Sequence, residues 1–428
     1  MNNQEYHNGR PTKNRSPVNN KNGENRSVKP SGAVVSVSGR ALAKREKEKN
    51  WENGIVRVKR GMDRPMLAII LILLVLGTVM VFSASFPSAY LDKGDSMHYL
   101  KRQLLFGTLG CALMIGLSFI PCNFYRKMSP PVYIVSILLL LVVLLIGTSE
   151  GVAKRWIALG SITFQPSEFA KAAVIMMLAW YFDRNYEKLS KRDSLKTTVW
   201  QGVCIPGVIL GIICFLVLME KHLSGTIIIA LISVCVVFLG GAHIGWTAGI
   251  YGAVGVLGIG AYLLTNPYAL QRILTHADED ADALAEAWQT TQGVYAIGSG
   301  GLLGKGLGDS WLKYNYVSQP QNDFIFTIWC EEMGLVGAII VIALYAAFVW
   351  RGFAIAKKAP DTYTSLVAFG ITCQVGIQAF LNMMVVTDLI PNTGISLPFF
   401  SYGGSSLIIL MCEMGILLSV SRHSYQKK

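Results

Sequence analysis

The sequence predicts an all-α, polytopic membrane protein with about ten transmembrane helices. Three observations support this: the composition, the length of the apolar runs and the placement of the basic residues. Of the 428 residues, 52% are hydrophobic and only 15% are charged. A soluble protein of this size needs more polar surface, because it cannot bury so many long apolar runs. The chain is therefore expected to lie in lipid.

Ten apolar runs predict the helices in chain order. Most approach the roughly 17 to 25 residues that cross the hydrocarbon core as an α-helix, and the fourth is short. The runs cover residues 66–82, 104–120, 132–147, 169–182, 199–219, 226–240, 245–264, 324–348, 366–386 and 405–420. An even number of spans places both chain ends on the same side of the membrane.

The net charge of +12 comes largely from the N-terminal tail and from alternate loops. The tail is rich in Asn, Ser, Gly and Lys, which predicts disorder, with a short basic helix lying against the membrane over residues 41–60. Basic residues recur at Arg126, Lys127, Arg184, Lys188, Lys191, Arg192, Lys196, Arg351, Lys357, Lys358, Arg422, Lys427 and Lys428. By the positive-inside rule both termini are cytoplasmic. The positive charge is thus explained by the orientation of the chain in the membrane, and it gives no support to nucleic-acid binding.

These features divide the chain into three parts. Residues 1–62 form the basic tail, which has no apolar core segment and so is not a signal peptide. Residues 63–422 form the ten-helix membrane domain, with a large extracytoplasmic loop over 266–322, and residues 423–428 form a cytoplasmic C-terminus.

Two pairs of ionisable residues stand out in the outer loop "EGVAKRWIALGSITFQPSEFAK". Lys154 and Arg155 oppose the positive-inside rule, and anion binding is the simplest reason for their presence. Glu168 and Lys171 are three residues apart, so they share one helix face if the fourth span begins near Pro166. Ionisable groups at that depth usually face the bundle interior or a watery cavity. A purely structural ion pair explains Glu168 and Lys171 about equally well.

Acidic residues mark the start of the eighth span, in "QNDFIFTIWCEEMG". From its spacing alone, Asp323 is favoured as the N-cap of that helix, which leaves a reactive carboxylate as the alternative. Glu331 and Glu332 are adjacent, so at most one can point at a given partner. Glu413, in the last span, is expected to join a buried polar network.

Two glycine-rich tracts are expected to form turns on the outer side. The tract "AIGSGGLLGKGLG" lacks the Ser or Thr that a phosphate-binding Walker loop needs after Lys305. Its glycines instead predict left-handed turns across the mouth of a cavity. The turn from Tyr402 to Gly404 leads into the last helix, whose first N–H groups can receive an anion. An enzyme acting on a charged lipid-linked substrate and a transporter of an anionic solute both remain open.

Four motifs, in order, resemble the SEDS family, which includes FtsW, RodA and SpoVE. They are "KRWIALGSITFQPSEFAK", "AIGSGGLLGKGLG", "NDFIFTIWCEEMGLVG" and "PNTGISLPFFSYGGSS". The resemblance runs from Pro65 to Arg422. It implies a SEDS fold and a peptidoglycan glycosyltransferase that polymerises lipid II on the outer face of the bacterial cytoplasmic membrane. The implied partner is a class B penicillin-binding protein, a transpeptidase.

The resemblance also implies which residues act. It assigns Asp323 as the essential, catalytic carboxylate of the family, and Arg155, Trp156, Glu168 and Lys171 as residues on which members rely. We further expect Lys154, Gln165, Lys305, Ser405 and Ser406 to bind substrate. No all-protein metal site and no organic cofactor are expected. A divalent cation, Mg²⁺ or Mn²⁺, held between Asp323 and the pyrophosphate is compatible with this pattern.

The sequence departs from the family pattern at three places. Where members often carry "PDLGT", this chain has "EKHLSGT", so Glu220 or His222 is expected to replace the missing Asp. Asp388 precedes "PNTG", near the expected cavity mouth. The outer loop is acidic at Asp278, Glu279, Asp280 and Asp282, where a solvated face is favoured over a cation or partner site, and a short surface helix is predicted over 281–288.

Two other functions compete with the enzyme. A lipid II flippase would need alternating access, usually built from internal repeats, and no convincing repeat relates the two halves of the chain. A non-catalytic scaffold would not require Asp323. Within the family, the basic tail favours a division role of the FtsW type at the septum, with divisome partners, over the elongation (RodA) or sporulation (SpoVE) role.

Overall fold

The computed structural model describes residues 55–56, 61–150, 153–159, 162–191, 197–267, 270–271, 285–314, 316–317, 319–424 and 426–427. The predicted disordered tail and the acidic residues at 278–282 lie outside these ranges. The basic helix predicted over 41–60 is wrong at Ile55 and Val56, which form strand β1. The surface helix predicted over 281–288 is helical where it is described, from Ala285 onward.

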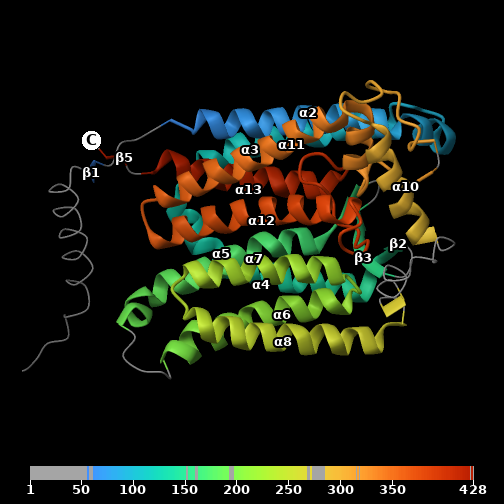
Figure 1. Ribbon diagram of the computed structural model, residues 1–428. Helices are drawn as coiled ribbons and strands as arrows, with labels where there is room; N and C mark the ends of the chain where they lie inside the picture. Colours follow the sequence, from blue (N-terminus) through green and yellow to red (C-terminus); the bar gives the residue numbers. More distant parts are fainter. Residues whose placement is uncertain are drawn as a thin grey trace, which may run out of the picture. The chain divides into compact units, whose positions relative to one another are not determined.

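Long, roughly parallel helices dominate the described chain (Figure 1). They are α2 (Arg64–Lys93), α3 (His98–Ser118), α4 (Cys122–Ile146), α5 (Pro166–Lys191), η1 (Thr197–Cys204), α6 (Ile205–Met219), α7 (Leu223–Leu239), α8 (Ile244–Thr265), α10 (Ala285–Ser299), α11 (Ile325–Lys357), α12 (Thr362–Val386) and α13 (Gly404–Arg422). Each of the ten predicted apolar runs corresponds to one helix of this set, with η1 and α6 forming one run.

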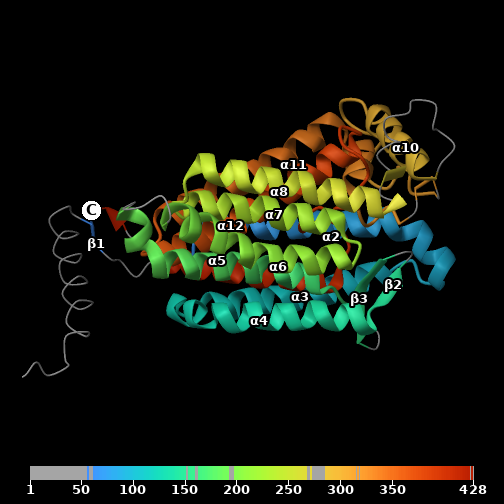
Figure 2. The ribbon, with the colours of Figure 1, turned by 90° about the horizontal axis from the view of Figure 1, so that it is seen from below.

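Within the described chain, eight helices are long and apolar enough to cross a membrane. The two remaining predicted spans fall short for simple reasons: α7 has 17 residues, and α5 carries Glu168, Lys171 and Asp183 among its apolar residues. The outer helices expose large apolar side chains, and only 6% of the apolar window of α8 is buried. Figure 1 shows α8 at the edge of the bundle, and Figure 2 shows the same helix seen from below. This is a multi-pass membrane protein.

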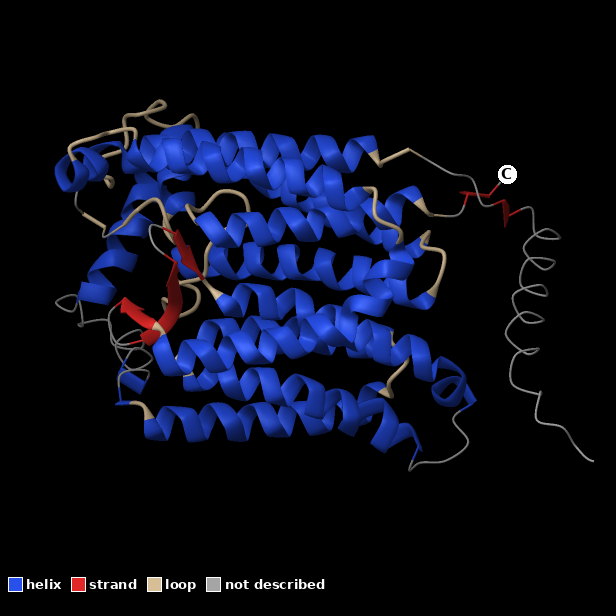
Figure 3. Ribbon diagram, turned by 180° about the vertical axis from the view of Figure 1, so that it is seen from behind, coloured by secondary structure: helices blue, strands red, loops and turns tan. Residues whose placement is uncertain are grey.

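A small antiparallel sheet covers one end of the bundle (Figure 3). It comprises β2 (Thr148–Glu150), β3 (Ala153–Leu159) and β4 (Ile162–Phe164), with Trp156 opposite Thr148 and Ile157 opposite Phe164. The sequence predicted only a loop here. The sheet holds Arg155 and Trp156 on a fixed strand and delivers the chain directly into α5 at Pro166, where the fourth span was expected to begin.

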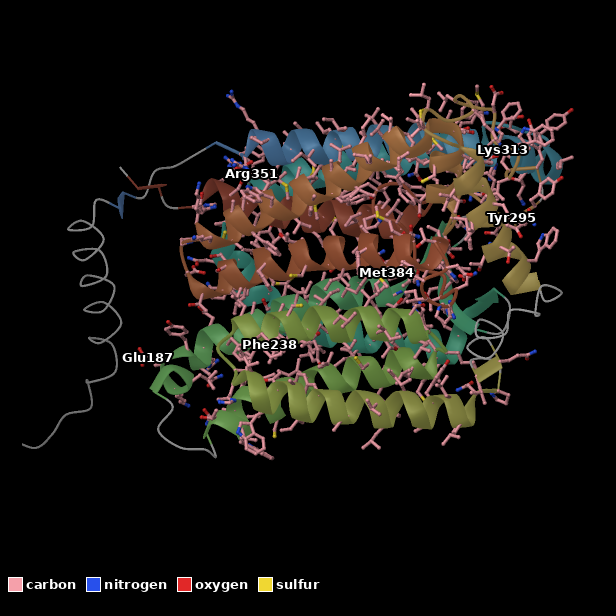
Figure 4. All side chains as sticks on the ribbon, in the orientation of Figure 1. Glu187, Phe238, Tyr295, Lys313, Arg351 and Met384 are labelled. Carbon is pink, nitrogen blue, oxygen red and sulfur yellow. The ribbon has the colours of Figure 1, made fainter. Side chains whose placement is uncertain are left out.

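The opposite end of the bundle holds both ends of the described chain. Strand β1 pairs with β5 (Gln426–Lys427), which agrees with an even number of spans. Asp63 caps α2 by accepting a hydrogen bond from the Met66 N–H and also forms an ion pair of 2.8 Å with Arg351 on α11. Figure 4 shows Arg351 at this end and Lys313 at the other.

Helix α11 is kinked where a glycine-rich loop docks on it. At Gly334 the backbone adopts φ 65° and ψ −165°, which interrupts the helix. The N–H groups of Lys305 and Gly306 donate to the carbonyls of Glu331 and Glu332, at 3.0 Å each, and the Leu335 N–H donates back to the loop. The loop glycines have positive φ at 301, 304, 306 and 308, so the predicted left-handed turns are confirmed. Their predicted place is wrong, because the loop packs on α11.

Replacing Gly334 with alanine should destabilise the protein. This φ, ψ region is essentially restricted to glycine and costs another residue about 1–3 kcal/mol. A Cβ atom would also lie 2.4 Å from the Gly304 nitrogen and 2.6 Å from the Leu302 carbonyl oxygen. Thermal unfolding in detergent should show a lower midpoint for Gly334→Ala. The matched control, Gly249→Ala on α8, has no atom within 4 Å of the added Cβ and should leave the midpoint unchanged or slightly higher. Equal midpoints for the two variants would contradict the assigned kink.

Candidate active site

A cavity of about 520 Å³ opens at the end of the bundle that carries the β2–β3–β4 sheet. Its wall combines the α2–α3 turn, strands β3 and β4, the start of α5, the α6–α7 turn and the segments that precede α11 and α13. Its lining is polar and includes Lys93, His98, Tyr99, Arg102, Phe106, Arg155, Trp156, Gln165, Ser167, Glu168, Lys171, His222, Asp323, Gln378, Gly394, Ser396, Tyr402, Gly403, Gly404 and Ser406. Segments far apart in sequence therefore share one chamber.

Asp323 lies on this wall, just before α11. The cap of that helix is Phe324, which makes no side-chain cap hydrogen bond, so the N-cap interpretation of Asp323 is wrong. The Asn382 side-chain amide on α12 donates to the Asp323 carbonyl oxygen at 2.9 Å and to the Ile395 carbonyl oxygen at 2.6 Å. At Gly394, which has φ 66°, a Cβ would lie 3.3 Å from Oδ2 of Asp323. Asn382 thereby fixes the backbone of Asp323, and Gly394 leaves room for its carboxylate.

Glu168 and Lys171 form the predicted pair on one face of α5. Their carboxylate oxygen and Nζ are 2.8 Å apart, and the Lys171 side chain is only 3% exposed. Nζ also donates to the Gln378 Oε1 on α12 at 2.9 Å, and the Gln378 amide donates to the Ser396 carbonyl oxygen at 3.0 Å. The pair thus links helices, as the structural interpretation predicted, and also lines the cavity, as the functional one did.

Arg155 connects the sheet to the α6–α7 turn, because its Nη2 donates to the Lys221 carbonyl oxygen at 2.8 Å. In that turn, burial lowers the pKa of His222 to about 3, helped by the positive charges of Arg155 and Lys171. Burial raises the pKa of Glu220 to about 8, against the opposing effect of Arg155. His222 is therefore neutral near pH 7. Of the two expected substitutes for the missing family Asp, only His222 lines the cavity.

Gln165, Trp156 and Ser406 also line the cavity as expected, but three predicted binding residues are not placed there. Lys305 forms an ion pair of 2.6 Å with Glu331 on α11, so its side chain holds the glycine-rich loop against that helix. Ser405 is buried behind the wall and is not among the lining residues. For Lys154, the backbone belongs to β3, and its side chain lies outside the described part of the structure.

The three acidic residues inside α11 and α13 have structural partners. Glu331 accepts hydrogen bonds from Lys305, Ser310 and the backbone N–H groups of 311 and 312. Glu332 accepts a hydrogen bond from the Ser83 hydroxyl on α2, whose Oγ lies 2.6 and 2.9 Å from its two carboxylate oxygens. Glu413 accepts one from Gln374 at 2.7 Å, as predicted for a polar network.

One basic wall of the cavity was not predicted from the sequence. Lys93, His98 and Arg102, from the α2–α3 turn and the start of α3, all line it. The sequence contained a sign of this wall, because Lys93 and Arg102 flank an outer loop and oppose the positive-inside rule in the same way as Lys154 and Arg155.

Among the described residues, no group of three or more His, Cys, Asp or Glu side chains is placed to hold a metal ion. The carboxylates on the cavity wall are Asp323 and Glu168, and Glu168 is paired with Lys171. Asp323 can supply one hard oxygen donor, so a divalent cation would take its remaining ligands from substrate oxygens and water, which is how Mg²⁺ is commonly bound.

Comparisons with known proteins agree with this architecture. Residues 64–426 match the family FtsW/RodA/SpoVE, described as "Cell cycle protein". The chain is 38% identical over 370 residues to Stage V sporulation protein E of Bacillus subtilis (strain 168), covering 86% of this chain and 98% of that protein. It is 34% identical over 369 residues to a Probable peptidoglycan glycosyltransferase FtsW of Geobacter sp. (strain M18), again covering 86% and 98%.

Two solved structures share the fold. One is the rod shape determining protein RodA of Thermus thermophilus, with TM-score 0.61, 28% identity and coverage of 85% of this chain and 98% of that chain. The other is a chain from a study of "structural coordination of polymerization and crosslinking by a peptidoglycan synthase complex", with TM-score 0.68, 27% identity and coverage of 84% and 98%. With a family match across nearly the whole membrane domain, this chain belongs to the FtsW, RodA and SpoVE family of cell cycle proteins.

Proposed function

We propose that this protein is a peptidoglycan glycosyltransferase that polymerises lipid II on the outer face of the cytoplasmic membrane. Relatives named as FtsW carry this activity in their names. The observation that carries the proposal is the shared wall: Asp323, Arg155 and Lys171 line one polar cavity at one end of the membrane helices. This arrangement provides a base and cations in one chamber, which glycosyl transfer from a diphosphate requires.

In the proposed reaction Asp323 is the general base. It takes the proton from the 4-hydroxyl of the acceptor's GlcNAc as that oxygen bonds to the anomeric carbon of the donor's MurNAc. The bond from this carbon to the diphosphate breaks, and the diphosphate leaves as an anion with both bonding electrons. Base catalysis of this type contributes about 10²–10⁴-fold to the rate. No strong general acid is needed, because the leaving group is already stable as an anion.

The cations of the cavity stabilise the charge that develops on the leaving diphosphate. Arg155 and Lys171 are held in place by Lys221, Glu168 and Gln378 before substrate arrives, so little reorganisation is needed during the reaction. Trp156 offers an apolar ring on the same wall for a sugar or the lipid neck. A divalent cation held by Asp323 and the diphosphate would supply further charge neutralisation.

The partner proposed for this chain is a class B penicillin-binding protein, the transpeptidase that crosslinks the product. The solved complex that couples polymerisation and crosslinking supports a partner of this kind for this fold. The FtsW names of many relatives support a division role at the septum, while the similarity to a sporulation protein keeps that role as the alternative.

The test is polymerisation of lipid II by the purified full-length protein in detergent or liposomes, with and without a transpeptidase partner. A ladder of glycan strands is expected once the partner is present. If lipid II is moved across the liposome membrane but never polymerised, the protein is a flippase. If neither occurs while the complex with the partner still forms, it is a scaffold.

A further inference from the structure

We infer that the cavity contains a second diphosphate subsite, built by Lys93 and Arg102, which binds the diphosphate of the acceptor lipid. This inference rests on the proposed function and extends it, because it assigns the two anionic substrates to different walls. The donor diphosphate lies against Arg155 and Lys171, and the acceptor diphosphate lies against the α2–α3 turn.

The cations that line the cavity outnumber the carboxylates that line it. The wall carries four cations, Lys93, Arg102, Arg155 and Lys171, against the carboxylates of Glu168 and Asp323. Glu168 is engaged by Lys171 at 2.8 Å. Within the described residues, neither Lys93 nor Arg102 has an ion-pair partner.

The nearby acid does not neutralise Arg102. Asp95, in the α2–α3 turn, pairs at 2.8 Å with Lys101, whose side chain is 65% exposed. Lys101 is not among the residues that line the cavity, whereas its neighbour Arg102 is. Adjacent residues of one helix thus serve different surfaces: Lys101 closes the turn, and Arg102 brings its charge into the chamber.

The side chains around Arg102 form a fixed face. Tyr99, Arg102 and Phe106 are spaced three and four residues apart, so they share one face of α3, and all three line the cavity. The Tyr99 ring meets the Tyr402 ring edge-on with centroids 5.0 Å apart. Phe106 packs over Gly404, where a Cβ would lie 2.6 Å from its ring. The basic wall is therefore held against the start of α13.

The other cation group has separate anchors. Arg155 lies on β3 and bonds to the α6–α7 turn, while Lys171 lies on α5 and bonds to α12. The two groups therefore belong to different walls of one chamber, held by different helices.

The reaction needs two such groups. In the donor, the diphosphate is attached to the carbon that reacts. In the acceptor, the reacting hydroxyl and the diphosphate lie at opposite ends of the disaccharide. When the acceptor hydroxyl reaches Asp323, its own diphosphate must lie a disaccharide away from the donor's. A second set of cations, on another wall, meets this requirement, and the aromatic rings of Tyr99 and Phe106 give the adjoining lipid neck an apolar surface.

The test measures the donor and acceptor dependence of transfer separately. The labelled donor is a lipid II analogue whose GlcNAc 4-hydroxyl is inverted, so that it cannot act as an acceptor. The acceptor is unlabelled lipid II or, in a second series, the same disaccharide-pentapeptide as a methyl glycoside, which lacks the diphosphate. The variants are Arg102→Gln and Lys93→Gln, and the matched control is Lys101→Gln, next to Arg102 in sequence but outside the cavity.

Arg102→Gln should raise the lipid II concentration for half-maximal transfer by roughly tenfold or more, because a charge-assisted contact is lost. Its donor dependence should stay within about twofold of wild type, and its rate with the acceptor that lacks the diphosphate should equal that of wild type. Lys93→Gln should shift the acceptor dependence in the same direction, which keeps the test valid if Arg102→Gln does not fold. Lys101→Gln should behave as wild type.

Two results would overturn the subsite. In the first, the acceptor concentration for half-maximal transfer is unchanged in both Arg102→Gln and Lys93→Gln. In the second, these variants shift the donor concentration for half-maximal transfer and leave the acceptor concentration unchanged. Both require a wild-type protein that makes glycan, so they refute this inference alone. A wild-type protein that transfers no sugar would refute the proposed function, and this inference with it.

Discussion

Asp323→Asn should abolish glycan synthesis and leave the protein folded. The amide keeps the shape of the side chain but cannot accept the proton of the attacking hydroxyl, so the rate should fall by about 10²–10⁴-fold, the contribution of a general base. The fold should persist because the substitution leaves the backbone carbonyl of this residue, which accepts a hydrogen bond from Asn382, unchanged. Initial rates of lipid II polymerisation, together with thermal unfolding in detergent, measure both expectations.

Asp388→Asn is the matched control for this experiment. Asp388 is an exposed acid of the neighbouring outer segment, but it is not among the residues that line the cavity. Its variant should polymerise lipid II as wild type does. Wild-type turnover by Asp323→Asn would remove the proposed base, and loss of activity in both variants would point to a general electrostatic effect of the outer acids.

Glu332→Ala should cause the largest loss of stability among single changes in the outer end of the bundle. Glu332 is fully buried and accepts a hydrogen bond from the Ser83 hydroxyl on α2, whose Oγ lies 2.6 and 2.9 Å from the two carboxylate oxygens. It also pairs at 3.3 Å with Lys313, which is 3% exposed. Removing one partner of a buried pair leaves an uncompensated charge and typically costs about 3–5 kcal/mol. The unfolding midpoint in detergent should therefore fall markedly.

The control for Glu332 is a solvent-exposed ion pair between the same kinds of side chain in the same protein. Lys101→Ala breaks the pair with Asp95, whose members are 65% and 44% exposed, and keeps the hydrogen bond that the Asp95 side chain accepts from the Met97 N–H. Exposed pairs contribute little, so the midpoint should not change measurably. Equal midpoints for Glu332→Ala and Lys101→Ala would show that the buried pair does not hold the outer loop to α2 and α11.

The membrane helices could be predicted from the sequence because a span has a simple physical signature. Apolar runs long enough to cross lipid identified α2 and α12 directly, and the even number of runs agrees with the meeting of β1 and β5. Helix α5 was found despite its charges, since Pro166 and the spacing of Glu168 and Lys171 fixed its start and its inner face. These features depend on local composition and spacing alone.

The arrangement of the outer end could not be predicted in the same way. The strands of the β2–β3–β4 sheet are short, and they lie between apolar spans where a loop is the default expectation. The partners of Glu331 and Glu332 depend on a loop some twenty residues away in sequence that folds back onto the kink at Gly334. Asp323 showed a related limit: its spacing favoured an N-cap, but the helix begins at Ile325 and Phe324 takes that position.

The bond pattern of Asn382 has a mechanical consequence. The Asn382 side-chain amide on α12 holds both the backbone that carries the proposed base and the neighbouring segment at Ile395. The two segments are therefore tied to the same helix. A movement of the peripheral helices that leaves α12 in place should leave the spacing between these two segments unchanged.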